Sequence, residues 1–139
     1  MDVTYPLLAP GETDLDKLLS GMRPRLHEAP LEFVHVPAGH DSKPHAEPLM
    51  MFREREGTTF IVAASPIVPG EESGRLLWAQ ITLDVQSSLS AVGMMAAASA
   101  ALAARGIACN PVSAYLHDHL FVPWQRRTEA LDALAHLEH

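Results

Sequence analysis

The sequence predicts an α+β protein in which helices cover one face of antiparallel strands. Three neighbouring stretches carry this prediction. Residues 76–84 alternate apolar and polar side chains, residues 89–105 place small apolar residues at helical spacing, and residues 107–123 hold two short apolar runs around a polar triplet. A strand, a helix and a hairpin in this order are typical of a ferredoxin-like unit, and a short helix over 124–134 completes the order βαββα.

The first half of the chain begins with an irregular arm and then a short helix. Thr13 is placed to cap this helix, and Asp16 adds a negative charge near its positive end. Pro24 ends the helix because proline cannot continue it. The apolar face is predicted to consist of residues at helical spacing, namely Leu15, Leu18, Leu19 and Met22.

Strands dominate the remainder of the first half. Residues 31–36 alternate and predict a strand, residues 37–48 hold three prolines and predict a loop, and residues 49–63 predict a hairpin that turns at Gly57. The first half therefore has the predicted order αβββ. Residues 65–74 combine prolines, glycines and glutamates, so we expect them to link the two halves.

The second half opens with the longest predicted strand, over residues 76–84. Ser87 and Ser88 then form a tight turn whose hydroxyls are placed to cap the helix over 89–105, and Gly106 is placed to end that helix. Because side chains alternate across a strand, one face of the first strand is expected to be apolar. Its members are Leu77, Ala79, Ile81 and Leu83.

Size and charge exclude several classes of function. The chain has 139 residues, of which 47% are hydrophobic, so it can form a packed core, and its net charge of −7 argues against nucleic acid as a partner. We expect neither a membrane span nor a secretory signal, because no apolar run has the required length or flanks. The single cysteine, Cys109, fits the cytoplasm. Residues 137–139 are interpreted as a tag remnant.

Several stretches in a particular order carry a resemblance to a known family. They are residues 11–15, residues 52–54 with 56–57, residues 87–93 (Ser-Ser-Leu-Ser-Ala-Val-Gly), Asn110, and residues 115–123 (Tyr-Leu-His-Asp-His-Leu-Phe-Val-Pro). With them the chain resembles short bacterial proteins of unknown activity that are built from two ACT-like halves.

The resemblance implies an atypical αβββ half over residues 1–70 and a βαββα half over residues 71–136. The loop over 37–48 is a departure, because it is long and rich in proline. By analogy with ACT domains, the resemblance also implies a regulatory module that binds an amino acid or a similar small effector, often where two domains pair.

The turn before the long helix is the leading candidate for the effector site. Free N–H groups and the positive end of the helix dipole at Ser87 and Ser88 would accept a carboxylate, although plain helix capping needs the same residues. Asn110 is expected to lie across from this turn, or else to bond the edge of the sheet. Asp84 or Asp118 would accept the ammonium group of an amino acid.

The triplet His117, Asp118 and His119 has three interpretations. Asp118 could hold a tight turn, the triplet could contact the effector, or both imidazoles could reach one metal ion because residues two apart on a strand point the same way. A metal site would need a third ligand, such as His35, His40 or His45. We expect no bound metal or cofactor. The expected ligand-binding residues are Asp84, Gln86, Ser87, Ser88, Asn110, His117, Asp118 and His119.

Catalysis is not expected. The sequence has no glycine-rich phosphate loop, no paired zinc cysteines and no nucleophile elbow, and Cys109 has no neighbour in sequence that would activate it towards His117 or His119. The leading function is therefore effector binding by a homo-oligomer, because small sheets with open edges tend to pair. The alternatives are a pure interaction module that forms dimers and a small metal-dependent enzyme that uses the histidines.

Overall fold

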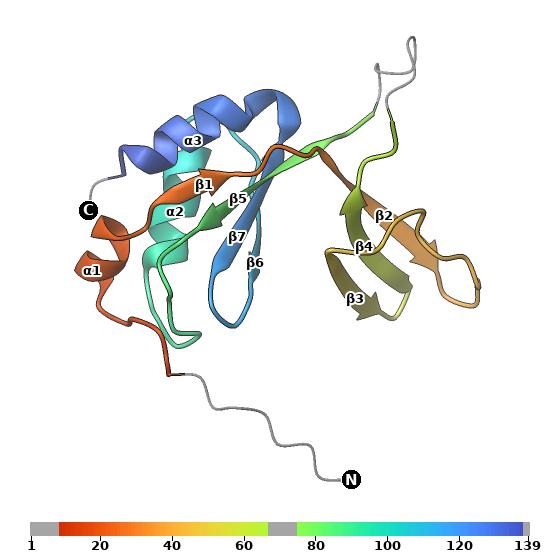
Figure 1. Ribbon diagram of the computed structural model, residues 1–139, viewed down its shortest axis with the longest axis horizontal. Helices are drawn as coiled ribbons and strands as arrows, with labels where there is room; N and C mark the ends of the chain where they lie inside the picture. Colours follow the sequence, from red (N-terminus) through yellow and green to blue (C-terminus); the bar gives the residue numbers. More distant parts are fainter. Residues whose placement is uncertain (1–8, 67–74, 138–139) are drawn as a thin grey trace, which may run out of the picture.

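The computed structural model describes residues 9–66 and 75–137, which form a curled antiparallel sheet with helices on one side (Figure 1). The elements of the first half are α1 (Leu15–Ser20), β1 (Pro24–Leu26), β2 (Leu31–Pro37), β3 (Met50–Glu54) and β4 (Gly57–Ala63). Those of the second half are β5 (Trp78–Leu83), α2 (Met94–Ala103), β6 (Asn110–Ser113), β7 (Asp118–Pro123), the 3-10 helix η1 (Trp124–Arg126) and α3 (Arg127–Ala135).

The second half has the predicted order βαββα, and its three strands lie in the order β5-β7-β6. The fourth strand of this sheet comes from the first half, because β1 pairs antiparallel with the free side of β5, from Pro24 opposite Leu83 to Leu26 opposite Ile81. The order β1-β5-β7-β6 is that of a complete ferredoxin-like sheet. The predicted α+β class and its ferredoxin-like second half are thus confirmed.

The chain then continues from β1 into a second group of strands. His27 N–H donates to Gln80 O, and Leu31 lies opposite Trp78, so the chain follows β5 along its whole length before it diverges. Beyond that point β2 pairs with β4, and β4 pairs with β3. Figure 1 shows these three strands leaving the helix-covered part of the sheet at an angle. The predicted hairpin of the first half is therefore confirmed as β3 and β4.

Two apolar clusters lie on opposite faces of the sheet. The larger cluster is enclosed between the sheet and the helices, and the alternate residues of β5 and β7 that point to it are Ala79, Ile81, Leu83, Leu120 and Val122. The smaller cluster lies on the other face around Leu31, Ile61 and Phe121. There the Phe33 ring packs 5.5 Å from the Trp78 ring and 5.9 Å from the Phe121 ring, measured between centroids. The predicted apolar face of the 76–84 strand is therefore the core face.

The predicted start of the long helix at residue 89 is wrong. Residues 88–91 form a turn in which Ala91 N–H donates to Ser88 O and Ser90 N–H donates to Ser88 Oγ. Gly93 then adopts a left-handed conformation with φ of 106°, and α2 begins at Met94. The small residues before Gly93 have helical spacing, but the N–H groups of Ser90 and Ala91 bond within the turn instead of within a helix.

Other boundaries differ from the predictions by a few residues. Asp14 rather than Thr13 caps α1, since its carboxylate accepts from Lys17 N–H. Strand β1 was not predicted, because Pro24 indicated only the end of a helix. The tip of the second hairpin lies over residues 114–117, so that Asp118 begins β7. Residues 67–74 of the predicted linker and 138–139 of the predicted tag lie outside the described residues.

Candidate functional site

A cavity of about 190 Å³ lies where the loop after β5 meets the start of α2. Four elements of the second half contribute to its wall: the loop, the first turn of α2, the end of β6 and the start of β7. Its polar lining residues are Ser87, Ser88, Ser113 and Asp118, and the others are Leu89, Ala91, Gly93, Met94 and Met95.

The start of α2 gives the cavity a positive side. Gly93 precedes the helix, and no side chain caps it. The first N–H groups of a helix have no partner within the helix, and the dipole places partial positive charge there. The left-handed backbone at Gly93 has Leu15 of α1 packed against it, since a Cβ would lie 3.1 Å from the Leu15 Cδ2 atom. This helix start can accept an anionic group.

Asp118 gives the cavity its negative side. Its side chain points towards the helices, as do those of Leu120 and Val122 along the same strand. Asp118 is only 8% exposed, and its carboxylate accepts a hydrogen bond of 3.3 Å from the Ser87 hydroxyl. Ser113 lies directly opposite Asp118 in the β6–β7 pairing. Among the lining residues Asp118 is the acidic one, so the cavity combines an anion-accepting helix start with one carboxylate.

A segment of the first half pairs with the loop that lines the cavity. Glu12 forms a parallel bridge with Ser87, because Glu12 N–H donates to Gln86 O and Ser88 N–H donates to Glu12 O. At Gly11 an added Cβ would lie 2.4 Å from the Ser87 carbonyl carbon, so only glycine allows this approach. The N–H group of Ser88, which was expected to be free for a carboxylate, is therefore already bonded.

Asn110, Asp84 and Gln86 do not line the cavity. Asn110 begins β6 opposite Phe121, at the end of the strand away from Ser113, so it does not lie across from the loop as expected. Asp84 is held outside by Arg25, with two contacts of 2.9 and 3.1 Å, and this hydrogen-bonded guanidinium lowers the pKa of Asp84. Gln86 is exposed and contributes its carbonyl to the Glu12 bridge.

His119 lies on the opposite face of the sheet from Asp118, because neighbouring residues of a strand point to opposite sides. Its Nδ1 lies 2.9 Å from Thr82 Oγ1 and 3.2 Å from Gln80 Nε2. His27, the residue after β1, places its Nε2 2.7 Å from the same hydroxyl, so the Thr82 side chain contacts both histidines. Burial, followed by the neighbouring His117 and His27, lowers the pKa of His119, and burial followed by Arg25 lowers that of His27.

The metal interpretation of the histidines gains no support from their arrangement. Within residues 9–66 and 75–137, no group of three or more His, Cys, Asp and Glu side chains could hold a metal ion. The His117 and His119 rings are 6.5 Å apart between centroids, and His45 bonds the Ala63 carbonyl. Cys109 is half-buried, and burial raises the pKa of its thiol.

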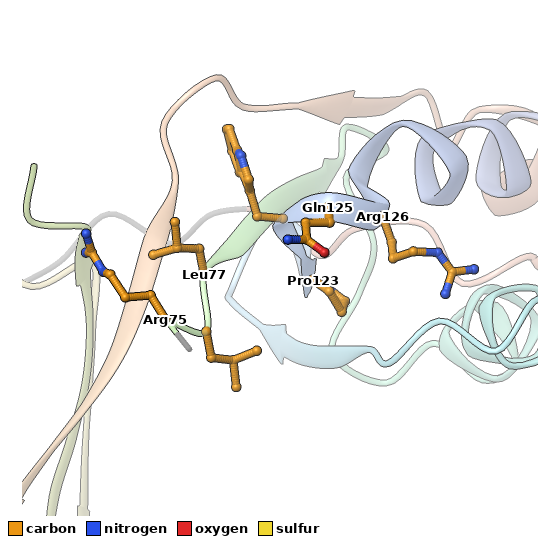
Figure 2. A pocket seen from close by; sticks show the side chains of 7 residues that line it. Arg75, Leu77, Pro123, Gln125 and Arg126 are labelled. Carbon is orange, nitrogen blue, oxygen red and sulfur yellow. The ribbon is translucent and has the colours of Figure 1, made fainter. Parts of the chain in front are cut away.

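A second cavity, of about 280 Å³, lies where the start of β5 meets the end of β7 and η1. Figure 2 shows Arg75 and Arg126 on opposite sides of it, with Pro123 and Gln125 between them. Arg75 contacts Glu32 at 2.7 Å, and Arg126 contacts Glu129 at 2.8 Å. Both guanidinium groups are thus paired, and among the described residues they are the only charged ones that line this cavity.

Sequence reasoning found three of the cavity's residues and missed others. Ser87, Ser88 and Asp118 were expected and lie together, whereas Ser113 and the start of α2 at Gly93 were not. A pairing of Ser113 with Asp118 follows from the hairpin once its turn is placed at residues 114–117. The glycine at position 93 was the available signal for the helix start.

The fold joins a ferredoxin-like unit, which β1 completes, and the β2-β4-β3 group of strands in one sheet, with a small polar site at a strand–helix loop. Two family models, each described as an ACT domain, match residues 10–66 and 75–136. The chain therefore belongs to the ACT-domain family and carries two such domains in tandem. ACT domains are typically regulatory modules that bind small molecules.

Solved structures agree with this assignment. A Vibrio cholerae protein of unknown function, described as a possible transport protein, is 36% identical with a TM-score of 0.74, over 90% of this chain and 95% of that one. A protein from Agrobacterium tumefaciens shares the fold at 17% identity and a TM-score of 0.61, over 84% and 92% of the two chains. No curated protein matches. No helix among the described residues is long and apolar enough to cross a membrane.

Proposed function

We propose that this protein is a regulatory module that binds an α-amino acid in the cavity at the start of α2 and catalyses no reaction. The observation that carries the proposal is the pairing of opposite charges across one small cavity. The uncapped helix start is on one side, and the buried Asp118 carboxylate is on the other. A free amino acid has the matching pair of charges on one carbon atom.

The proposed binding mode uses each wall of the cavity. The ligand carboxylate accepts hydrogen bonds from the first N–H groups of α2, as anions do at helix starts. The ammonium group donates to Asp118 and to the Ser113 hydroxyl, which lies opposite it. The ligand side chain packs against Leu89 and Met95. Since ligand pockets of about 300 Å³ and above hold drug-sized molecules, a cavity of about 190 Å³ fits a small amino acid.

A thermal-shift screen of the amino acids, followed by calorimetry, tests the proposal. A ligand at 100 times its Kd should stabilise the protein by about 2.7 kcal/mol. Asp118→Asn should weaken that ligand at least tenfold, because it removes the charge that pairs with the ammonium group. Asp41→Asn, an equal charge change on an exposed loop, is the matched control and should bind as the wild type does. If no amino acid binds, or if Asp118→Asn binds unchanged, the proposal is wrong.

We also propose that the protein works as a homo-oligomer, in line with the typical behaviour of ACT domains. The observation that favours self-association is an open edge strand, β3, with large apolar side chains exposed on it. We propose the cytoplasm as its compartment, because its one cysteine, Cys109, has no partner for an internal disulfide.

A further inference from the structure

The outer edge of β3 is open, and large apolar side chains in and beside this strand are exposed. β3 ends the strand order of the sheet and pairs on one side only, with β4. Leu49, Met51 and Phe52 are 53%, 53% and 64% exposed, and they are three of the eight exposed large hydrophobic residues in the described part of the chain. Open edges with exposed apolar side chains are surfaces on which sheets extend.

The backbone of β3 is able to bond a further strand. Ala64 N–H donates to Pro30 O just beyond the β2–β4 pairs. Because bonding alternates along an antiparallel strand, the backbone groups of Val62, Phe60 and Thr58 in β4 point towards β2. The residues between them bond towards β3, as Leu49 N–H does to Ile61 O. In the β3–β4 register this leaves the N–H and C=O groups of Met51 and Arg53 pointing outwards.

The β6 edge of the sheet is blocked by a proline. Ala114 N–H donates to His117 O, which continues the β6–β7 ladder past its last pair. By the same alternation, the outward groups of β6 belong to Pro111 and Ser113. Pro111 has no N–H, so β6 cannot offer a full row of hydrogen bonds to a neighbour.

The β1 edge is blocked in the same manner. His27 N–H donates to Gln80 O in step with the β1–β5 pairs, so an outward position of β1 falls on Pro24. The free side of β2 ends at Pro37 and lies in the angle where β2 diverges from β5 (Figure 1). Among the edges that the structure describes, β3 therefore combines exposed apolar side chains with a row free of proline.

We propose that two copies of this chain pair through β3, antiparallel and around a two-fold axis at Phe52. The inference rests on the proposed self-association and specifies its surface. In this register Met51 of each copy bonds Arg53 of the other, and the two Phe52 residues lie opposite one another. Because Arg53 then faces a methionine, no like charges are directly opposed across the axis.

The partner is a second copy because β3 is complementary to itself. Its outward groups come from two residues placed symmetrically about Phe52, which is the arrangement that a two-fold antiparallel pair requires. The pairing continues the sheet from one copy into the other and covers the exposed Phe52 and Met51 side chains. It leaves the cavity at α2, on the other half of the chain, open to the ligand.

A cysteine cross-link tests the register. In a Cys109→Ala background, Phe52→Cys should form a disulfide-linked dimer under mild oxidation. Opposed residues in a non-bonded pair have Cα atoms about 4.5 Å apart, within the range of a disulfide. Glu54→Cys is the matched control and should not cross-link. The two copies of residue 54 would be separated by about four residues along the strands, or about 14 Å.

A backbone variant tests the same surface in solution. The wild type should have twice the chain mass of 15.1 kDa by light scattering, and Met51→Pro should halve that value. The substitution removes an outward N–H without touching the β3–β4 ladder, so its circular dichroism spectrum should be unchanged. A dimer that persists in Met51→Pro, with no cross-link at residue 52, would overturn the β3 interface but not self-association. A wild type that is monomeric at high concentration would overturn both.

Discussion

The hydroxyl of Ser87 donates a hydrogen bond of 3.3 Å to the carboxylate of Asp118, and both residues are more than nine-tenths buried. The bond fastens the loop that follows β5 to the first residue of β7. It thereby holds the carboxylate at the edge of the cavity beside the start of α2.

Ser87→Ala should destabilise the protein by about 1–3 kcal/mol, because a buried carboxylate loses its donor. Urea unfolding measures the loss. The double variant Ser87→Ala with Asp118→Asn provides the control. If the residues act as a pair, the losses of unfolding free energy in the two single variants should sum to more than the loss in the double variant. Strictly additive losses would contradict the coupling.

The stability of the fold should depend on the neutral forms of His27 and His119. The pKa of each is lowered in the folded state, first by burial, so each binds protons more readily when unfolded. Between the lowered folded pKa and the ordinary value of about 6.5, the unfolded state holds more protons. Stability should therefore be complete above about pH 6.5 and fall as the pH drops through the folded pKa values.

Thermal unfolding between neutral and mildly acidic pH measures this dependence. His119→Gln should flatten the profile, since it removes one of the two groups that titrate around Thr82. His40→Gln, on an exposed loop, is the matched control and should leave the profile as it is. A wild-type profile that rises on acidification would refute the assignment.

Gly11→Ala should destabilise the protein and weaken the binding of the effector. The new Cβ would lie 2.4 Å from the Ser87 carbonyl carbon and 2.6 Å from Ser88 N, so the Glu12 bridge or the loop must shift. A loss of about 1–3 kcal/mol is expected from overpacking of this kind. Ser42→Ala, on an exposed loop, serves as the comparison in unfolding and calorimetry. An equal loss at both positions would mean that contact with the loop is unimportant.

Cys109 should react slowly with thiol reagents. The thiolate is the reactive species, and burial raises the pKa of this half-buried thiol. Alkylation by iodoacetamide near pH 8 should be slower than that of free cysteine, and it should accelerate in urea. A rate faster than that of free cysteine would instead support activation of Cys109 by a histidine, which its described contacts do not indicate.

The second half was predictable because its signals are local. The alternation of Leu77, Ala79 and Ile81 reports a strand with one buried face, and the hairpin strands after α2 pair with close neighbours in sequence. Strand β1 was not predictable in the same way. Its three residues include Pro24, and its partner Leu83 lies far along the chain, so only tertiary pairing makes this segment a strand.

The candidate site was predicted only in part, because the face of the sheet on which each strand residue lies was not taken into account. Asp118 and His119 are neighbours in sequence and looked like one cluster, but a strand sends them to opposite faces of the sheet. Asp118 therefore faces the cavity, and His119 joins Thr82 on the far side. The position of Asn110 depended on where the hairpin turns, and that turn lies a few residues before the predicted one.

β1 belongs to the first half in sequence and to the second half in space, where it completes the sheet beside β5. Neither half should therefore be separable, or exchangeable as a cassette, at the boundary between the two matched domains. A fragment over 75–136 would lack a strand of its own sheet and expose the bonding groups of Gln80 and Thr82. Although the two domains follow one another in the sequence, they should therefore unfold as a single unit.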